Sequence, residues 1–167
     1  MRRYGEAVGQ PVVVERTTTV PRAADEVWAR VTTPAGIRAE LLPWLSMTTP
    51  PRLRGRTLDD AADLLGRPLG KAWLLLFGVL PVDYDDMTIV AVEPFRSFHE
   101  RSRMLLLSRW EHERVVTPTD EGSCEVSDRL TFEPRLRFVG PAARRLVGAL
   151  FGHRHRRLQA WARSLRR

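Results

Sequence analysis

A long helical stretch at the end of the chain, Pro141 to Arg167, carries an arginine in the middle of its apolar face. At about 100° per residue, Arg154 falls near the centre of the stripe formed by Ala143, Leu146, Val147, Leu150, Leu158, Trp161 and Leu165. A guanidinium that points at a core must meet carboxylates or water. The helix therefore predicts either a buried ion-pair network or a wet internal cavity beneath it.

The composition is that of one globular domain over residues 1–167. With 43% hydrophobic and 28% charged residues, the chain can fill one core. The longest apolar run, Ala72 to Leu80, is interrupted by Gly78 and is too short to cross a bilayer. Cys124 is the only cysteine, which excludes an intramolecular disulfide and fits a reducing cytoplasm. We expect a cytoplasmic protein without a cofactor, as a monomer or a homodimer.

The net charge of +7 invites a nucleic-acid interpretation, but the basic residues are spread along the chain, and all of the 27 except Lys71 are arginines. Such a bias is typical of a GC-rich bacterial genome. Only the terminal segment is dense enough to attract nucleic acid or an anionic membrane, and the alternative is that it forms the solvated face of a helix. Its basic residues are Arg154, Arg156, Arg157, Arg163, Arg166 and Arg167. Its only aromatic, Trp161, lies on the apolar face, so base stacking and hence nucleic acid are disfavoured, while a peripheral membrane contact stays open.

The order of predicted elements is strand, two short helices, several strands and a long helix. Val12 to Val20 is rich in Val and Thr, and Thr33-Pro34 is a helix-starting pair. An insertion with a helical turn is expected at 58–65, a strand buried on both faces around 73–77, and an acidic loop at 83–86. The predicted elements are strands at 12–20, 87–93, 97–104, 109–116 and 124–133, and helices at 23–31, 33–42 and 141–166.

Alternation along the last three strands separates core from solvent. Asp128 shares its parity with Val126 and Leu130, His112 with Trp110 and Arg114, and Glu100 with Phe98 and Met104. Glu100, His112 and Asp128 therefore face inward from neighbouring strands. The long helix is the only element large enough to cover them, so Arg154 would meet two acids and a histidine. A structural salt-bridge network and a network that also contacts a ligand both fit this pattern.

Five segments in this order resemble the helix-grip proteins of the SRPBCC superfamily, which includes START domains, polyketide cyclases and the birch-pollen allergen group. They are Val20 to Trp28, Phe98 to Glu100, Trp110 to His112, Asp128 to Pro134 and Phe151 to Leu158. The resemblance implies an α+β helix-grip fold, in which a curved antiparallel sheet of about seven strands, within residues 11–134, wraps around the helix at 141–166. It also implies an apolar cavity that opens near the two short helices.

On this plan the leading hypothesis is that the cavity binds a hydrophobic or amphipathic small molecule, such as a lipid or polyketide. The alternative is a cyclase-like or dehydratase-like enzyme in which His112 acts as acid or base, Asp128 or Glu100 orients it, and Arg154 stabilises an enolate. No metal is expected, because His153 and His155 point away from each other on a helix and are interpreted as surface residues. The candidate lining residues are Trp44, Met47, Trp73, Phe77, Phe98, Trp110, Phe132, Phe151 and Leu158, with Glu100, His112, Asp128 and Arg154 as polar anchors.

Overall fold

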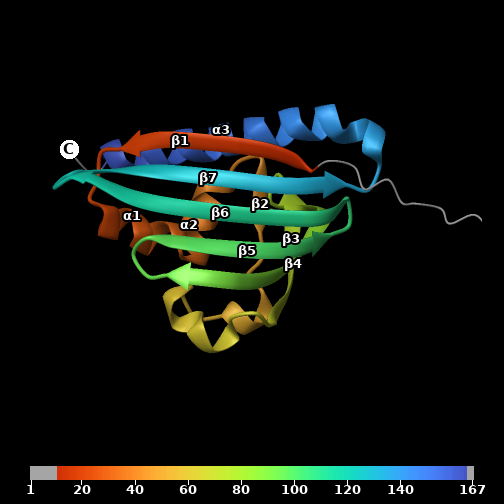
Figure 1. The fold of residues 1–167 in the computed structure, drawn as a ribbon, viewed down its shortest axis with the longest axis horizontal. Helices are drawn as coiled ribbons and strands as arrows, with labels where there is room; N and C mark the ends of the chain where they lie inside the picture. The colour runs from red at the N-terminus through yellow and green to blue at the C-terminus, as the bar shows by residue number, and fades with distance from the viewer. Residues whose placement is uncertain (1–10, 165–167) are drawn as a thin grey trace, which may run out of the picture.

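A computed structural model describes residues 11–164, in which a seven-stranded sheet and three α-helices form an α+β fold (Figure 1). Three short 3-10 helices, η1 (Pro51–Leu53), η2 (Asp59–Leu64) and η3 (Arg137–Val139), lie in the connections. The strands are β1 (Val12–Val20), β2 (Leu45–Met47), β3 (Pro68–Leu76), β4 (Leu80–Glu93), β5 (Ser97–Met104), β6 (Leu107–Asp120) and β7 (Ser123–Pro134), and the helices are α1 (Ala24–Val31), α2 (Pro34–Leu41) and α3 (Gly140–Ser164).

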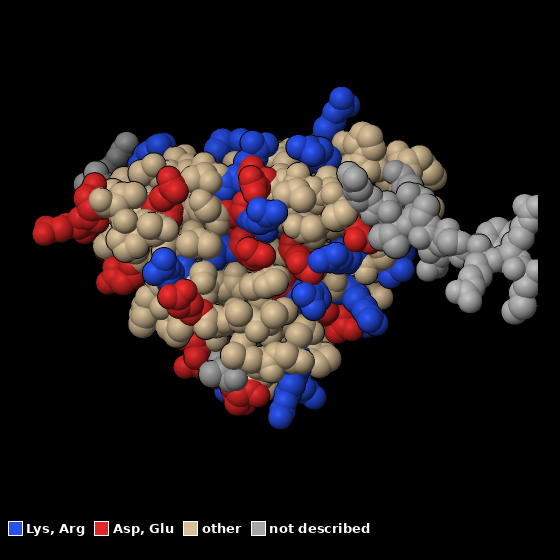
Figure 2. Space-filling model, viewed as in Figure 1, with Lys and Arg blue, Asp and Glu red and all other residues tan. Residues whose placement is uncertain are grey.

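All seven strands are antiparallel, in the order β1-β7-β6-β5-β4-β3-β2. The first and last strands are therefore neighbours, and α3 packs against β1, β7 and α2 (Figure 1). The outer face of the sheet carries charged side chains of both signs, which intermingle over the strands in Figure 2. The predicted helix-grip architecture is confirmed, including the two short helices after the first strand.

Helices α1 and α2 approach each other unusually closely. The Thr33 side chain caps α2 by accepting a hydrogen bond from the Gly36 amide at 3.1 Å, and Pro34 occupies the first helical position, as predicted. A Cβ atom at Gly36 would lie 1.9 Å from the carbonyl oxygen of Arg30, so only glycine fits there. This contact places Arg30 of α1 beside Glu40, one turn after Gly36.

The interior consists of two apolar clusters separated by a layer of charged side chains. One cluster contains Trp28, Val126 and Leu158, and the other contains Trp110 and Phe151. The layer between them interrupts β6, β7 and α3 at the same level, because each of these elements contributes apolar residues on both sides of it. We call this layer the polar belt, and its buried members are Glu40, Glu100, His112, Arg114, Asp128, Arg154 and His155.

Two predicted elements in the middle of the chain differ from the structure. The acidic stretch 83–86 belongs to β4 and is not a loop, and Asp83 and Asp85 share the inward parity of Met87. Strand β3 begins at Pro68 and is not buried on both faces, because Trp73 is half exposed. The helical turn expected at 58–65 is present as η2, and the long helix ends at Ser164 in the described residues, so its predicted end at 165–166 lies outside them.

Candidate functional site

Asp128 is the centre of the polar belt. Its Oδ1 accepts hydrogen bonds from Arg114 Nε and pairs with His112 Nε2, both at 2.7 Å. Its Oδ2 accepts from Arg114 Nη2 and pairs with His155 Nε2, again at 2.7 Å. The carboxylate is buried, and each oxygen therefore meets one guanidinium nitrogen and one imidazole. This bidentate geometry is the strong form of an arginine–carboxylate contact.

Glu40 joins the sheet to the helices. Arg114 Nη1 on β6 donates to both of its carboxylate oxygens, at 3.0 and 3.1 Å, and Arg154 Nε on α3 donates to Oε2 at 3.0 Å. Arg154 is also held over the Phe151 ring, 4.7 Å from its centroid. Because all of these groups are buried, removal of Glu40 would leave Arg154 without its carboxylate partner.

Glu100 closes the other side of the belt. Its Oε1 accepts from Trp110 Nε1 at 3.2 Å and lies 3.5 Å from His112 Nδ1, so both ring nitrogens of His112 face carboxylates. Burial alone would lower the pKa of His112, but Asp128 and Glu100 raise it above its usual value. Burial would raise the pKa of Glu100, but His112 and Trp110 lower it. The arrangement thus favours a protonated His112 between two carboxylates.

Two buried carboxyl groups have pKa values shifted in opposite directions. Burial would raise the pKa of Asp128, but the charge and hydrogen bonds of Arg114, and then those of His112, hold it well below its usual range. Asp85 bonds no arginine, and burial followed by repulsion from Glu100 outweighs the lowering effects of Ser102 and His112 and raises its pKa to about 8. Asp85 is therefore protonated at neutral pH, while Asp128 stays ionised.

The position of Arg154 confirms that it is buried but corrects its partner. We expected Arg154 to meet Glu100, His112 and Asp128, whereas its hydrogen bond goes to Glu40, and it is Arg114 that binds Asp128. The buried face of α3 is centred on Phe151, Leu158 and Ala162, about 70° around the helix from the predicted stripe at 100° per residue. Arg154 consequently lies at the edge of that face, toward α2, and Leu146 of the predicted stripe is exposed.

The sequence reasoning missed three members of the belt. His155 was interpreted as a surface residue and is buried against Asp128; its spacing from Phe151 and Leu158, four and three residues, could have indicated this. Arg114 shares the inward parity of His112, which is also a readable signal. Glu40 has no such signal, because its burial depends on the packing of α2 against α3.

The structure separates the predicted lining aromatics into two groups. Buried side chains include Phe98, Trp110, Phe132, Phe151 and Leu158, and Trp110 packs against both Phe132 and Phe151 with ring centroids 5.9 and 6.2 Å apart. Trp44, Trp73 and Phe77 instead lie at the surface, and Met47 is half-buried. Contact of any of these residues with a ligand stays a prediction.

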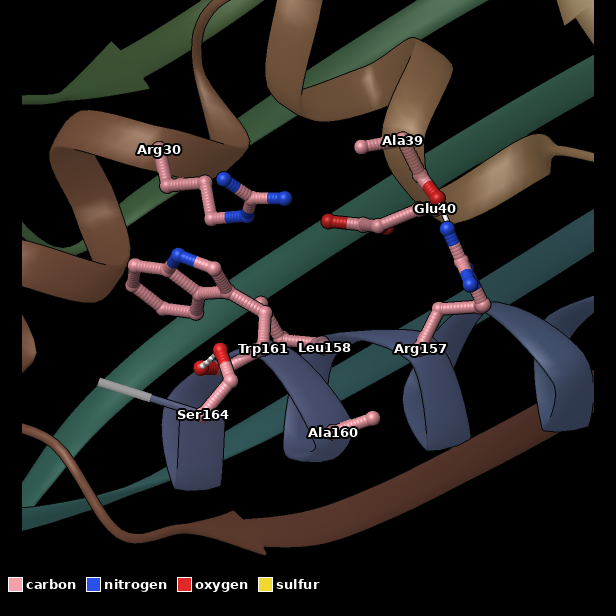
Figure 3. Close-up of a pocket in the computed structure, with 8 residues that line it drawn as sticks. All are labelled: Arg30, Ala39, Glu40, Arg157, Leu158, Ala160, Trp161 and Ser164. Carbon is pink, nitrogen blue, oxygen red and sulfur yellow. Dashed lines mark hydrogen bonds between the residues drawn. The ribbon is translucent and has the colours of Figure 1, made fainter. Parts of the chain in front are cut away.

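A hollow of about 290 Å³ lies between α1, α2 and the last turns of α3 (Figure 3). The guanidinium of Arg30 stacks on the Trp161 ring, 4.5 Å from its centroid, and Glu40 and Arg157 lie opposite. Burial lowers the pKa of Arg30. Its Nε is buried and makes no hydrogen bond within residues 11–164. The lining residues are Arg30, Ala39, Glu40, Arg157, Leu158, Ala160, Trp161 and Ser164.

A second hollow, a groove of about 430 Å³, lies on the other flank of α3, along β1. Arg16 of β1 reaches across it to the carbonyl oxygen of Gly148 at 3.4 Å, and Gln159 of α3 bonds Thr18 at 2.7 Å. His155 lines this groove, as Glu40 lines the first hollow. The polar belt therefore runs through the domain from one flank of α3 to the other.

Within residues 11–164, no cluster of three or more His, Cys, Asp or Glu side chains has a metal-binding arrangement, and no helix is long and apolar enough to cross a membrane. His153 pairs with the carbonyl oxygen of Leu42 at 2.8 Å, apart from His155. Of the arginines expected at the helix end, Arg163 is exposed, and Arg166 and Arg167 lie outside the described residues.

A family model described as a domain of unknown function (DUF8410) matches residues 18–162. Solved structures with the same fold include a START superfamily protein from Mycobacterium smegmatis, with a TM-score of 0.67 and 15% identity over 92% of this chain and 98% of that one. Norcoclaurine synthase from Thalictrum flavum, in complex with dopamine and hydroxybenzaldehyde, matches with a TM-score of 0.60 and 14% identity over 92% and 87%. DynU16, from the dynemicin biosynthetic locus, has a TM-score of 0.52 and 19% identity over 88% and 47%. No curated protein matches the sequence. These likenesses show that the chain shares the helix-grip fold of these proteins.

Proposed function

We propose that this chain, which belongs to the family described as a domain of unknown function (DUF8410), binds a small amphipathic molecule. The START-like fold supports this class of function. The proposed site is the hollow between α1, α2 and α3 (Figure 3). Relatives in the fold support the class of function, since norcoclaurine synthase is described with two small aromatic molecules bound. The contacts of Arg30 support the place.

The main support for this proposal is the environment of the Arg30 guanidinium. It is stacked on Trp161, lies near Glu40, and keeps a buried Nε–H that donates to no described residue. Buried donors in proteins are nearly always hydrogen-bonded. A ligand oxygen next to Arg30 would accept this bond, while the faces of Trp161 and Leu158 would hold an apolar ring.

The size and charge of the hollow narrow the class of ligand. At about 290 Å³ it is close to the lower limit of ordinary ligand pockets, about 300 Å³, so it suits a molecule of one or two rings. Arg30 and Arg157 line it with one acid, Glu40, whose charge Arg114 and Arg154 already engage. The ligand should therefore carry a carboxylate, sulfonate or phenolate next to an apolar body.

The enzymatic alternative gains no support from His112. Catalysis needs the imidazole in contact with a ligand, but both of its ring nitrogens face carboxylates. His112 lines neither of the two hollows beside α3. We therefore assign His112, with Asp128 and Glu100, to the structural network.

Two experiments test the proposal. Native mass spectrometry of the protein purified from its own host should find a co-purifying small molecule. In a direct assay, the anionic aromatic probe anilinonaphthalene sulfonate is titrated into the wild type and the variant Arg30→Ala. Loss of one charge-assisted hydrogen bond, about 1.5–3 kcal/mol, should weaken binding by about tenfold or more.

The matched control is Arg38→Ala on α2, because Arg38 is exposed and outside the hollow. It should bind the probe as the wild type does. Equal affinities for the wild type and Arg30→Ala, with both proteins folded, would place the binding site elsewhere.

A further inference from the structure

One end of the sheet exposes apolar side chains from three separate connections. The β3–β4 turn, the β5–β6 turn and the β7–α3 connection all lie at this end, because antiparallel pairing puts the ends of β3, β5 and β7 on the same side of the sheet. The β5–β6 turn and the β7–α3 connection are at the right of Figure 1. Val79 and Phe138 are each 80% exposed. We call this end the apolar tip; its exposed apolar residues are Phe77, Val79, Leu80, Leu105, Leu106, Leu136, Phe138 and Leu146.

The β5–β6 turn in the apolar tip has its backbone polar groups satisfied by its neighbours. Asp83 of β4 accepts hydrogen bonds from the amides of Leu105 at 2.7 Å and Leu106 at 3.3 Å. Arg135, after β7, donates its Nε to the Leu105 carbonyl at 2.9 Å and its backbone amide to that of Leu106 at 3.2 Å. The two leucine side chains project from a turn whose amides and carbonyls are all bonded.

The β3–β4 turn bonds its backbone amides to neighbouring carbonyls. The amide of Phe77 donates to the carbonyl of Trp44 at 2.8 Å, and the amide of Val79 donates to that of Leu76 at 3.2 Å. The Phe77 ring also packs on Trp44, with centroids 6.1 Å apart. A backbone that satisfies its own polar groups is what an apolar medium requires of a segment that enters it, because hydrocarbon offers no hydrogen bonds.

The chain segments that form the apolar tip carry charge of one sign. Residues 77–82, 105–106 and 135–147 contain no Asp or Glu, but they include Arg135, Arg137, Arg144 and Arg145. Arg144 and Arg145 are exposed in the first turns of α3, the end of a helix that attracts anions. Asp83, the nearest acid, is buried and already bonded to the β5–β6 turn.

We propose that the apolar tip docks on an anionic lipid bilayer. Leucine, valine and phenylalanine side chains enter the headgroup–acyl boundary, and the exposed Arg144 and Arg145 contact the anionic headgroups. A bilayer fits this end better than a protein partner does, because the apolar residues project from several turn tips that bond their own backbone groups, with cations around them. This contact lies at the opposite end of α3 from Arg163.

The test is flotation of the purified protein with vesicles of phosphatidylcholine, with and without phosphatidylglycerol. The wild type should float with the mixed vesicles, and added salt should weaken the association because part of it is electrostatic. The double variant Leu105→Glu/Leu106→Glu should bind at least about tenfold more weakly, since two apolar side chains are lost to the bilayer. Arg144→Glu/Arg145→Glu should weaken binding to the mixed vesicles.

Two controls change the same kinds of residue away from the tip. Phe95→Glu replaces an exposed aromatic in the β4–β5 turn at the other end of the sheet, and Arg163→Glu replaces an arginine at the other end of α3. Both should float as the wild type does. The proposal fails if the wild type ignores mixed vesicles or if Leu105→Glu/Leu106→Glu binds equally well. Analytical ultracentrifugation gives a third outcome that contradicts the proposal. If the wild type is a dimer that does not bind vesicles, and Leu105→Glu/Leu106→Glu is a monomer, the tip is an interface between two copies of the chain.

Discussion

Asp128→Asn is the sharpest test of the polar belt, because the substitution keeps the shape of the side chain and removes its charge. Each oxygen of Asp128 accepts one bond from Arg114, at 2.7 Å. Whichever way the asparagine amide is turned, its NH2 group therefore faces an N–H of Arg114. One imidazole partner, His112 or His155, loses its carboxylate oxygen as well.

The expected cost follows from these contacts. Two charge-assisted hydrogen bonds are lost, at about 1.5–3 kcal/mol each, and breaking a buried ion pair by removing one partner costs about 3–5 kcal/mol. We expect Asp128→Asn to lower the free energy of unfolding by about 3–5 kcal/mol. For a domain of this size that corresponds to a fall in Tm of about 6–20 °C.

Urea unfolding, followed by tryptophan fluorescence and circular dichroism, measures this difference. The control is Glu125→Gln, an exposed acid on the same strand, which should change stability by no more than about 0.5 kcal/mol. Because the folded pKa of Asp128 is depressed, its stabilisation is present above the ordinary carboxyl pKa and is lost as the pH falls below about 4. A loss under about 1 kcal/mol at neutral pH would refute the central role of Asp128.

Two further substitutions test other parts of the structure. The folded pKa of Asp85, about 8, lies above the ordinary carboxyl value. The free energy of unfolding of the wild type should therefore fall as the pH rises from the ordinary carboxyl pKa to about 8. Asp85→Asn lacks this loss and should gain stability relative to the wild type across that window. Urea titrations below and above the window check this, and parallel profiles for the two proteins would contradict it. Gly36→Ala should destabilise the domain by about 3 kcal/mol or more, since its Cβ would lie 1.9 Å from Arg30 O, whereas Gly140→Ala, with open space around it, should be nearly neutral in thermal unfolding.

The alternation of side chains along the strands was the most reliable predictor of which charged residues are buried. It placed Glu100, His112 and Asp128 inward, because period-two alternation is fixed by the backbone and survives the exchange of an apolar residue for a charged one. The same alternation extends to Asp83 and Asp85, but turn-like acidic composition concealed it. Strand geometry therefore outweighed local composition in β4.

The face of α3 was less predictable from hydrophobicity. Gly148 and Ala162 are buried because the sheet lies close to the helix there, and His155 is buried because Asp128 binds it. A prediction from large apolar residues alone places Leu146 on the buried face, although it is exposed, and leaves these three positions out. The offset matters for the site, since it turns Arg154 away from the strands and toward Glu40 on α2.

The polar belt also explains why the proposed ligand site lies on a flank of α3 rather than beneath its centre. Between the two apolar clusters, Arg114 and Arg154 converge on Glu40, and their buried bonds leave no reason for a ligand to replace them. Displacement of either guanidinium would break buried charge-assisted hydrogen bonds to Glu40, each of which stabilises the fold by about 1.5–3 kcal/mol. Glu40 is where this network lines the hollow, so a ligand beside Arg30 would contact the belt at its edge and leave its internal bonds intact.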